Sequence, residues 1–332
     1  MRSDRLKLFA FVVTGLCVGV AGMILASLMN AGQPTAGRGF ELTVIAAVIL
    51  GGTSLFGGRG SIVGTLLASP GWPPLGPLVW GNLGIALSAA CAAAINHVLD
   101  QRIDEQMART RNRPLPKGKI STPRALSFAA LLGTLSMLIL WWLVNPLTAV
   151  LTFFSLIGYA VIYTAWLKRA TSQNIVIGGA AGAAPPVLGW AAVTNSIDPD
   201  ALLLFLIVFV WTPPHFWALA IARKDEYARA GIPMLPVTHG VPYTRLQVLL
   251  YTVLLVLVTL MPFVTGMSGL IYLAASLVLN GVFLYYALAM QLTERQDLPM
   301  RVFKFSVTWL LWIFAALLVD HYIPTTQLIA AG

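Results

Sequence analysis

Eight apolar segments, each about as long as a bilayer is thick, constrain the fold of this chain more than any other feature. A helix that crosses the hydrocarbon core needs about 20 mostly apolar residues. The segments occupy 79–99, 125–143, 146–166, 174–193, 201–222, 246–264, 268–290 and 303–322. Only 10% of the 332 residues are charged, and the mean hydropathy is +0.81. A soluble domain has roughly 25% charged residues, so the composition excludes a water-soluble enzyme and predicts an all-α polytopic membrane protein.

The positive charges between these segments indicate their orientation. Lys and Arg gather in one set of connectors, seven of them in 100–124, whereas the alternate connectors contain none. The first set consists of 100–124, 167–173, 223–245 and 291–302, and the second of 144–145, 194–200, 265–267 and the tail after 322. By the positive-inside rule the first set is cytoplasmic and the C-terminus lies outside. The net charge of +9 therefore reflects topology in a lipid bilayer, and we expect no nucleic-acid partner.

The first 70 residues fit this pattern less well. Positive residues precede an apolar run at 8–29, which resembles a signal anchor or a first span that starts inside. A second stretch, 43–69, is interrupted by glycines and by Arg59. If both stretches crossed fully, the 79–99 helix would start inside, against the other seven segments. We therefore expect either that 43–69 re-enters the membrane or that this end is not folded as a second crossing.

The cysteines and three of the histidines carry little functional signal. Cys17 and Cys91 lie in apolar segments without a spaced partner, which favours neither a disulfide framework nor a zinc site. His239 lies in a polar loop and His321 at the outer end of the last span, where surface or interfacial positions are expected. His97 is explained by its polar neighbours.

A row of oxygen-bearing side chains marks the first cytoplasmic boundary. Asn96, Asp100 and Asp104 recur at i, i+4 and i+8, so a continued helix would place them along one face. Two carboxylates and an amide oxygen form a ligand set suited to Mg²⁺, which keeps several waters and shares itself with substrate phosphates. The alternative is a solvated helix end whose carboxylates pair with Arg102 or Arg109.

A cationic segment follows this acid ridge (Asn96, Asp100 and Asp104). Its positive residues are Arg109, Arg111, Arg113, Lys117 and Lys119. They exceed what topology requires, and Arg guanidinium groups bind phosphate oxygens through paired hydrogen bonds. Acid ridge and cationic segment together predict a site for a Mg²⁺–diphosphate complex.

The second cytoplasmic boundary combines a prolyl-rich, aromatic stretch with charges. Pro213-Pro214 is expected to break or kink its helix. His215 lies between aromatic residues inside a span, where an ionisable group is a functional candidate, and the alternative is a core histidine bonded to a carbonyl. Asp225 and Glu226 are adjacent, so at most one of them faces the acid ridge.

Two further stretches have open interpretations. Lys168 and Arg169 begin a polar cytoplasmic loop that either contacts phosphate or is a plain loop. The run Gly178–Pro186 consists of small residues and prolines within a span. It allows close helix packing or leaves room for a flat or long apolar ligand.

The chain resembles two known families in different parts. Residues 41–61 resemble a segment of ribose-type ABC sugar permeases, and we place a permease-like segment at 1–65. Residues from about 66 to 332 resemble the UbiA superfamily of intramembrane prenyltransferases and, within it, the haem O synthases (protohaem IX farnesyltransferases). The matching motifs are Asn96–Asp104, Met107–Pro116, Thr171–Gly182, Trp211–Trp217 and Asp225–Pro236, with Pro70–Leu75 before them.

The second resemblance implies a reaction and a fold. The family transfers the farnesyl group of farnesyl diphosphate to a vinyl group of haem b, with addition of water, in a ring of about nine antiparallel helices around a central cavity. It implies that Asn96, Asp100 and Asp104 bind Mg²⁺ and diphosphate. Asp225 would be a second metal ligand, and Arg109, Arg113, Lys117, Lys168 and Arg169 would contact substrate. His215 would contact the haem, as axial ligand or near the reacting vinyl group.

The resemblance also implies a location and leaves alternatives open. The family lies in the bacterial inner membrane with its active-site loops cytoplasmic, and a haem A synthase is an expected downstream partner. This chain lacks the family's usual entry into the first helix, which helps to wall the cavity. The alternatives are a quinone-pathway aromatic prenyltransferase, a sugar permease-related protein and an inactive composite.

Overall fold

The computed structural model describes residues 60–106, 110, 112–167 and 170–323. The chain divides into Met1–Ile45 and Ala46–Gly332, and all described residues belong to the second unit. The apolar run at 8–29 and most of the stretch 43–69 lie outside the described residues. The structure therefore tests the prediction of about nine helices only for the helices from residue 60 onward. Every regular element of the described residues is helical, which confirms the all-α prediction.

Eight helices of the described residues are long and apolar enough to cross a membrane, and each overlaps one predicted segment. They are Pro77–Leu99, Thr122–Leu143, Pro146–Thr164, Asn174–Thr194, Pro199–Ala222, Val241–Val264, Leu270–Leu292 and Leu298–Tyr322. The chain is therefore a multi-pass membrane protein.

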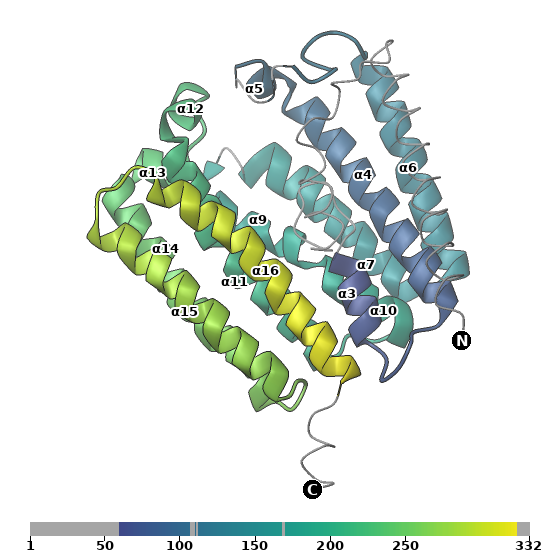
Figure 1. Ribbon diagram of the computed structural model, residues 1–332. Helices are drawn as coiled ribbons and strands as arrows, with labels where there is room; N and C mark the ends of the chain where they lie inside the picture. Colours follow the sequence, from purple (N-terminus) through teal and green to yellow (C-terminus); the bar gives the residue numbers. More distant parts are fainter. Residues whose placement is uncertain (1–59, 107–109, 111, 168–169, 324–332) are drawn as a thin grey trace, which may run out of the picture. The chain divides into compact units, whose positions relative to one another are not determined.

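Several of these spans consist of two consecutive helical elements, and Figure 1 labels the α-helices among them. The first combines the π-helix η1 (Pro77–Gly81) with α4 (Asn82–Leu99), and the third combines α7 (Pro146–Ile157) with the π-helix η2 (Gly158–Leu167). The remaining elements are α3 (Gly60–Leu67), α5 (Gln101–Gln106), α6 (Thr122–Leu143), α9 (Asn174–Ala183), α10 (Pro185–Thr194), α11 (Pro199–Ala222), α12 (Lys224–Arg229), α13 (Leu235–Thr238), α14 (Val241–Val264), α15 (Leu270–Leu292) and α16 (Leu298–Tyr322).

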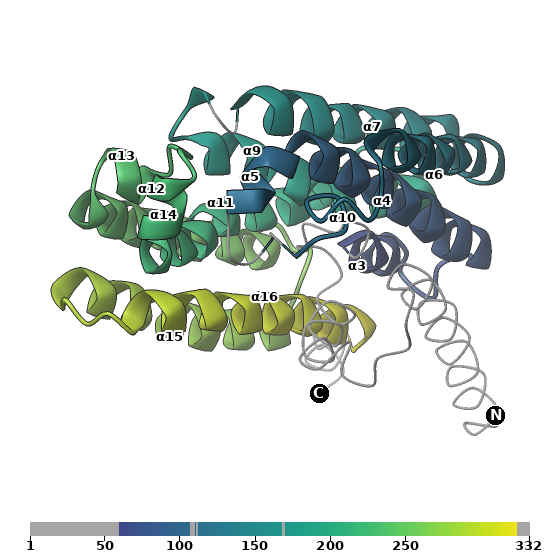
Figure 2. The ribbon, with the colours of Figure 1, turned by 90° about the horizontal axis from the view of Figure 1, so that it is seen from above.

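Helix α11 is the centre of the packing. It contacts α9, α14 and α16, whereas α4 packs chiefly on α6 and α15 lies between α14 and α16. Figure 2 shows α15 and α16 side by side in one layer. The large side chains of Trp211, Trp217 and Trp309 are almost completely buried between these helices.

The two adjacent prolines of α11 correct one part of the sequence expectation of a break or a kink, namely the break. Pro213 and Pro214 lie inside a continuous helix rather than at a break. Both are buried, and α11 is surrounded by neighbouring helices at this level. This packing holds the helix together although both residues lack the N–H that an interior turn normally uses.

Helix α3 packs closely on α10, with backbone against backbone. A Cβ atom at Gly64 would overlap the carbonyl oxygen of Pro186, and one at Gly189 would overlap the carbonyl oxygen of Ser61. Glycine is therefore required on both helices. Tyr322 Oη donates to the Leu66 carbonyl at 3.0 Å, which joins α3 to the end of the last span.

Helices α14, α15 and α16 are joined by buried polar contacts. Asp320 of α16 accepts hydrogen bonds from the backbone N–H groups of Gly269, Ile271 and Tyr272 at the start of α15. Asn280 donates to Thr259 Oγ1 at 2.8 Å and accepts from Trp309 Nε1 at 3.1 Å. Such bonds satisfy helix ends and polar side chains where water is absent.

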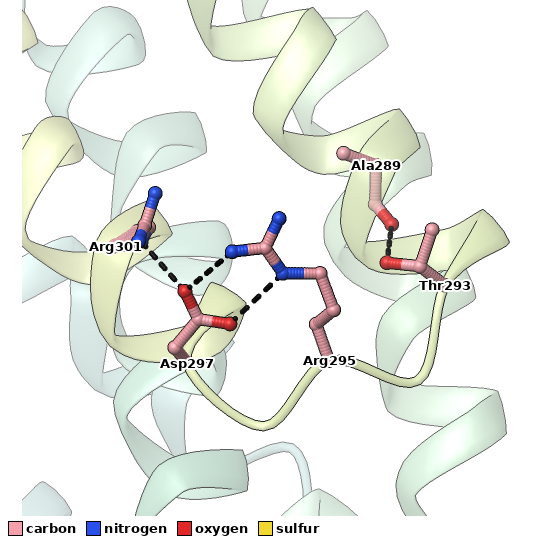
Figure 3. A network of polar contacts seen from close by, with 5 residues as sticks. All are labelled: Ala289, Thr293, Arg295, Asp297 and Arg301. Carbon is pink, nitrogen blue, oxygen red and sulfur yellow. Dashed lines mark hydrogen bonds and ion pairs between the residues drawn. The ribbon is translucent and has the colours of Figure 1, made fainter.

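The connection from α15 to α16 carries an exposed charge network (Figure 3). Asp297 pairs with Arg295 at 2.9 Å and with Arg301 at 2.7 Å, and Thr293 donates to the Ala289 carbonyl at 2.7 Å. The hydrogen bond from Arg295 lowers the pKa of Asp297 below its ordinary value of 3.8. Because these groups are exposed, the network organises the loop and contributes little to stability.

Candidate functional site

The acid ridge lies where α4 meets α5. Helix α4 ends at Leu99, and Asp100 follows with φ −90° and ψ 0° before α5 begins at Gln101. The prediction of one continuous helix is therefore wrong, because the helix is interrupted at Asp100. The hydrogen bonds nevertheless keep the helical spacing, because Asp100 N donates to the Asn96 carbonyl at 2.9 Å and Asp104 N donates to the Asp100 carbonyl at 2.8 Å.

Both carboxylates of this ridge are buried. Asp100 is 3% exposed and Asp104 is 4% exposed. Asn96 Oδ1 is also buried and has no hydrogen-bond partner among the described residues. This burial contradicts a solvated helix end, whereas a pairing of the carboxylates with Arg109 lies outside the described residues.

The described part of the loop after α5 contacts the acid ridge and α5. Arg113 Nη1 lies 2.6 Å from Asp104 Oδ2, and Thr110 Oγ1 donates to the Asp104 carbonyl at 3.1 Å. Gln101 Nε2 donates to the Leu115 carbonyl at 3.5 Å. The ion pair of the acid ridge among the described residues is therefore formed by Arg113. The alternative interpretation of the sequence expects Arg102 or Arg109 in this role. Lys117 lies exposed in the same loop, and the predicted contacts Arg109, Lys168 and Arg169 lie outside the described residues.

A central cavity opens between α4, α7, η2, α9 and α11. Its empty space is about 950 Å³, the open solvent at its mouth included. The small residues Ser88, Gly178 and Gly182 help to line it, together with Tyr159 and Trp211. The run of small residues from Gly178 to Pro186 helps to line this space. It also allows close helix packing, because a Cβ atom at Gly179 would lie 3.1 Å from Thr212 Cγ2 on α11.

Tyr159 lines the cavity and was not among the predicted site residues. Its hydroxyl oxygen is buried without a hydrogen-bond partner among the described residues. Asp100 and Arg113 both act electrostatically on it. Its ring stacks on Tyr163, with the centroids 5.6 Å apart. The available signal was the pair of tyrosines four residues apart inside a span, since buried Tyr hydroxyls normally have a partner.

The charged residues that follow α11 are more exposed than the acid ridge. Asp225 lies exposed in the first turn of α12, and its neighbour Glu226 accepts from Arg223 Nη1 at 3.4 Å. Figure 1 shows α5 and α12 at the same end of the helices. Within the described part of the chain, no three His, Cys, Asp or Glu side chains gather as a metal site. Asp225 therefore stays a prediction.

His215 lies in the helix core between α11 and α16. It is 6% exposed, and its Nδ1 lies 2.7 Å from Ser306 Oγ. The ring stacks on Trp211 at 4.2 Å and on Phe303 at 4.6 Å. Trp211 and Phe216 line the cavity, whereas His215 is not among the lining residues. These contacts are those expected for a histidine of the helix core, the alternative interpretation of His215. Its partner is the Ser306 hydroxyl, whereas that interpretation expects a carbonyl.

The other histidines in the described residues have structural contacts. His239 is exposed, with Nδ1 2.8 Å from Thr238 Oγ1, and His321 Nε2 lies 2.8 Å from the Ser69 carbonyl. His97 lies near the charges of Arg113, Asp104 and Asp100. His239 is thus on the surface, as expected, and His321 joins the last span to the segment after α3.

Comparisons with known families divide the chain in two. Residues 60–318 match the UbiA prenyltransferase family. Residues 1–70 match the family described as branched-chain amino acid transport system / permease component. The second match supports a permease resemblance at this end.

Individual relatives and solved structures agree with the first match. A protoheme IX farnesyltransferase of Methylococcus capsulatus is 62% identical over 263 residues, covering 79% of this chain and 88% of that protein. One of Hahella chejuensis is 58% identical over 266 residues, covering 80% and 89%. The structure of digeranylgeranylglyceryl phosphate synthase has a TM-score of 0.69 at 19% identity and covers 79% of this chain and 92% of that chain. A UbiA homolog from Archaeoglobus fulgidus, bound to DMAPP and Mg²⁺, has a TM-score of 0.57 at 17% identity and covers 82% and 96%.

Proposed function

The chain belongs to the UbiA prenyltransferase family, and we propose that it transfers the farnesyl group of farnesyl diphosphate to a vinyl group of haem b, giving haem O. The observation that carries this proposal is the 62% identity to a protoheme IX farnesyltransferase across 88% of that protein. The buried acid ridge beside an apolar cavity supports it from the structure.

The acid ridge fits a hydrated Mg²⁺ ion. Asp100 and Asp104 supply buried carboxylates, and Asn96 supplies a buried amide oxygen without a described partner. These are hard oxygen donors, and substrate phosphates and waters complete the shell that Mg²⁺ prefers. When bound, Mg²⁺ neutralises charge on the leaving diphosphate.

The cationic segment completes the diphosphate site. Arg113 already contacts Asp104, so its guanidinium group is held beside the ridge at 23% side-chain exposure. From there it can bind phosphate oxygens as charge develops on the leaving group. We propose the same role for Arg109, Lys117, Lys168 and Arg169, and a second ligand position for Asp225.

The cavity holds the apolar part of the reaction. The bond between C1 of the farnesyl chain and the diphosphate oxygen breaks, and its electrons leave with the diphosphate. The vinyl group of haem b supplies the electrons of the new carbon–carbon bond. Water adds to the resulting cation and loses a proton, which gives the hydroxyethylfarnesyl group. Walls of small and aromatic residues keep the reacting carbons away from other water.

The proposed setting is the bacterial inner membrane, with the acid ridge on the cytoplasmic side and the C-terminus outside. The positive connectors support this orientation, and a haem A synthase would consume the product. We assign residues 1–65 to a permease-like segment and 66–332 to the prenyltransferase. The contacts of α3 with α10 favour placing α3 with the prenyltransferase as well.

A competition assay tests the acceptor. Membranes containing the full chain receive farnesyl diphosphate, Mg²⁺ and equal amounts of haem b and 4-hydroxybenzoate, and both products are measured by mass spectrometry. We expect farnesyl plus water on haem and no prenylated benzoate. Prenylated benzoate alone would establish the quinone-pathway alternative. No product from inserted, folded protein would contradict the proposed function and support the inactive composite.

A further inference from the structure

One face of the third span carries a hydroxyl group at each successive turn. Thr148, Thr152, Ser155 and Tyr159 follow one another at spacings of four, three and four residues, from α7 into η2. Side chains at these spacings lie on one face of a helix. The three hydroxyl residues of α7 are its only polar side chains, so the polarity of this helix is confined to that face. We call these four residues the hydroxyl face.

Two threonines of the hydroxyl face differ from buried threonines on other helices. Thr212, Thr252 and Thr259 each donate to the carbonyl four residues earlier, at 2.8, 2.7 and 2.8 Å. Such a bond to the helix's own backbone satisfies a buried hydroxyl. Thr148 and Thr152 are 0% and 2% exposed, yet their Oγ1 atoms have no hydrogen-bond partner among the described residues. A buried hydroxyl without a partner is unfavourable, so these groups are available to a bound polar molecule.

Three members of the hydroxyl face line the central cavity. Thr152, Ser155 and Tyr159 are among its lining residues, whereas Thr148 is not. The Tyr159 hydroxyl likewise has no partner among the described residues. Ser88 lines the same cavity from α4, which contacts α7. A buried water molecule makes about three hydrogen bonds to polar groups, and these hydroxyls supply that number.

The helical spacing brings the cavity-lining hydroxyls within reach of a shared water molecule. Side chains three or four residues apart on a helix have Cβ atoms about 5–6 Å apart. Thr152 and Ser155 are three residues apart, and Ser155 and Tyr159 are four apart. Hydrogen bonds between oxygen atoms are about 2.7–2.8 Å long, so one water bridges hydroxyls at this separation.

We propose that Thr152 and Ser155, together with Tyr159, bind the water molecule that adds to the cation formed on the haem side chain. The inference rests on the proposed function and names the site of its water substrate. In this step a lone pair of the water oxygen forms the new carbon–oxygen bond, and one O–H bond of the water breaks. The proton goes to the diphosphate that the same reaction releases, so no further reactant is needed.

A bound water decides between two fates of the cation. If no water adds, the cation loses a proton from the neighbouring carbon and becomes an alkene, which is lighter than the hydroxylated product by one water. An otherwise apolar cavity offers few other water positions, so the hydroxyl face directs the reaction toward the hydroxylated product. The ratio of the two products therefore reports on this site.

The product ratio tests the water site with two matched variants. Thr152→Val replaces the hydroxyl by a methyl group, and Thr148→Val makes the same change one turn away, outside the cavity lining. Membranes with each full-length chain receive haem b, farnesyl diphosphate and Mg²⁺, and mass spectrometry measures both products. We expect the alkene share to rise several-fold in Thr152→Val alone, while the total amount of farnesylated haem stays within about twofold. An alkene share in Thr152→Val equal to that in Thr148→Val would overturn the proposal.

Radiolytic labelling tests the same site without turnover. Short X-ray exposure of the full chain in heavy-oxygen water, with a radical scavenger in the bulk solution, oxidises side chains beside bound water. We expect heavy oxygen on Tyr159 in the unaltered chain and in Thr148→Val, and several-fold less in Thr152→Val. Equal labelling of Tyr159 in the two variants would overturn the water site. Absence of farnesylated haem from the unaltered chain would contradict the proposed function, and the labelling would then decide whether water binds here.

Discussion

Arg113 Nη1 lies 2.6 Å from Asp104 Oδ2, and this pair fixes the cationic segment against the acid ridge. The two residues come from separate elements, one from the loop after α5 and one from α5 itself. The carboxylate side chain is 6% exposed and the guanidinium side chain 23% exposed. The pair therefore places a cation beside a buried carboxylate of the acid ridge, and the proposed metal–diphosphate site needs charges of both signs.

Removing the Arg113 side chain is expected to weaken diphosphate binding. Arg113→Ala leaves Asp104 buried without this cation and should cost about 2 kcal/mol, or roughly 30-fold in kcat/KM for farnesyl diphosphate. Lys119→Ala is the matched control, because Lys119 is an exposed cation of the same loop. Steady-state kinetics on membranes checks this. Equal effects of the two changes would mean that only the net positive charge of the loop matters.

Tyr159→Phe is expected to separate activity from stability. Its hydroxyl has no described hydrogen-bond partner, so its loss should leave the unfolding temperature unchanged or raise it slightly. If the hydroxyl binds substrate, kcat/KM should fall about tenfold. Tyr285→Phe, at a position that is 67% exposed, should change neither quantity. Full activity in Tyr159→Phe would remove this hydroxyl from the site.

The contact between α3 and α10 is expected to tolerate no added methyl group. Gly189→Ala would force the Ser61 backbone away and should destabilise the protein by about 1–3 kcal/mol. Gly281→Ala is a helical control, because a Cβ atom there would meet nothing within 4 Å. Thermal unfolding in detergent compares the two. An unfolding temperature that Gly189→Ala leaves unchanged would show that α3 does not hold this position.

His215 is expected to stabilise the helix core rather than ligate haem iron. Its stacking on Trp211 and Phe303 and its contact with Ser306 predict a loss of about 2–3 kcal/mol in His215→Ala. Ser306→Ala should reproduce part of this loss. The Soret band of bound haem b should stay unchanged in both variants. A shifted or lost Soret band in folded His215→Ala would restore the axial-ligand hypothesis.

The sequence predicted the spans and the acid ridge well because both depend on local patterns. Apolar length and the absence of positive charge from alternate connectors are enough to find eight helices. Asn96, Asp100 and Asp104 keep their four-residue spacing even though α4 ends at Leu99. Burial of the two carboxylates could not be read from the pattern, since it depends on the loop that folds back over them.

Features that depend on contacts between distant segments were less predictable. Pro213 and Pro214 signal a helix break locally, but the packing around α11 keeps the helix continuous. His215 between aromatic residues suggests a ligand, but Ser306 and Phe303 of α16 surround it. Tyr159 was missed from the sequence, because the burial of its hydroxyl and the electrostatic effect of Asp100 on it arise only in the folded chain.

Mg²⁺-dependent turnover in Asp100→Asn membranes tests the central claim most directly. The full chain and this variant receive haem b, farnesyl diphosphate and Mg²⁺, and mass spectrometry measures haem that has gained farnesyl and water. We predict product from the unaltered chain, loss of that product with EDTA, and at least about a hundredfold less product from the variant at equal folded protein. Product at the same level from Asp100→Asn, or undiminished by EDTA, would contradict a metal–diphosphate site on the acid ridge.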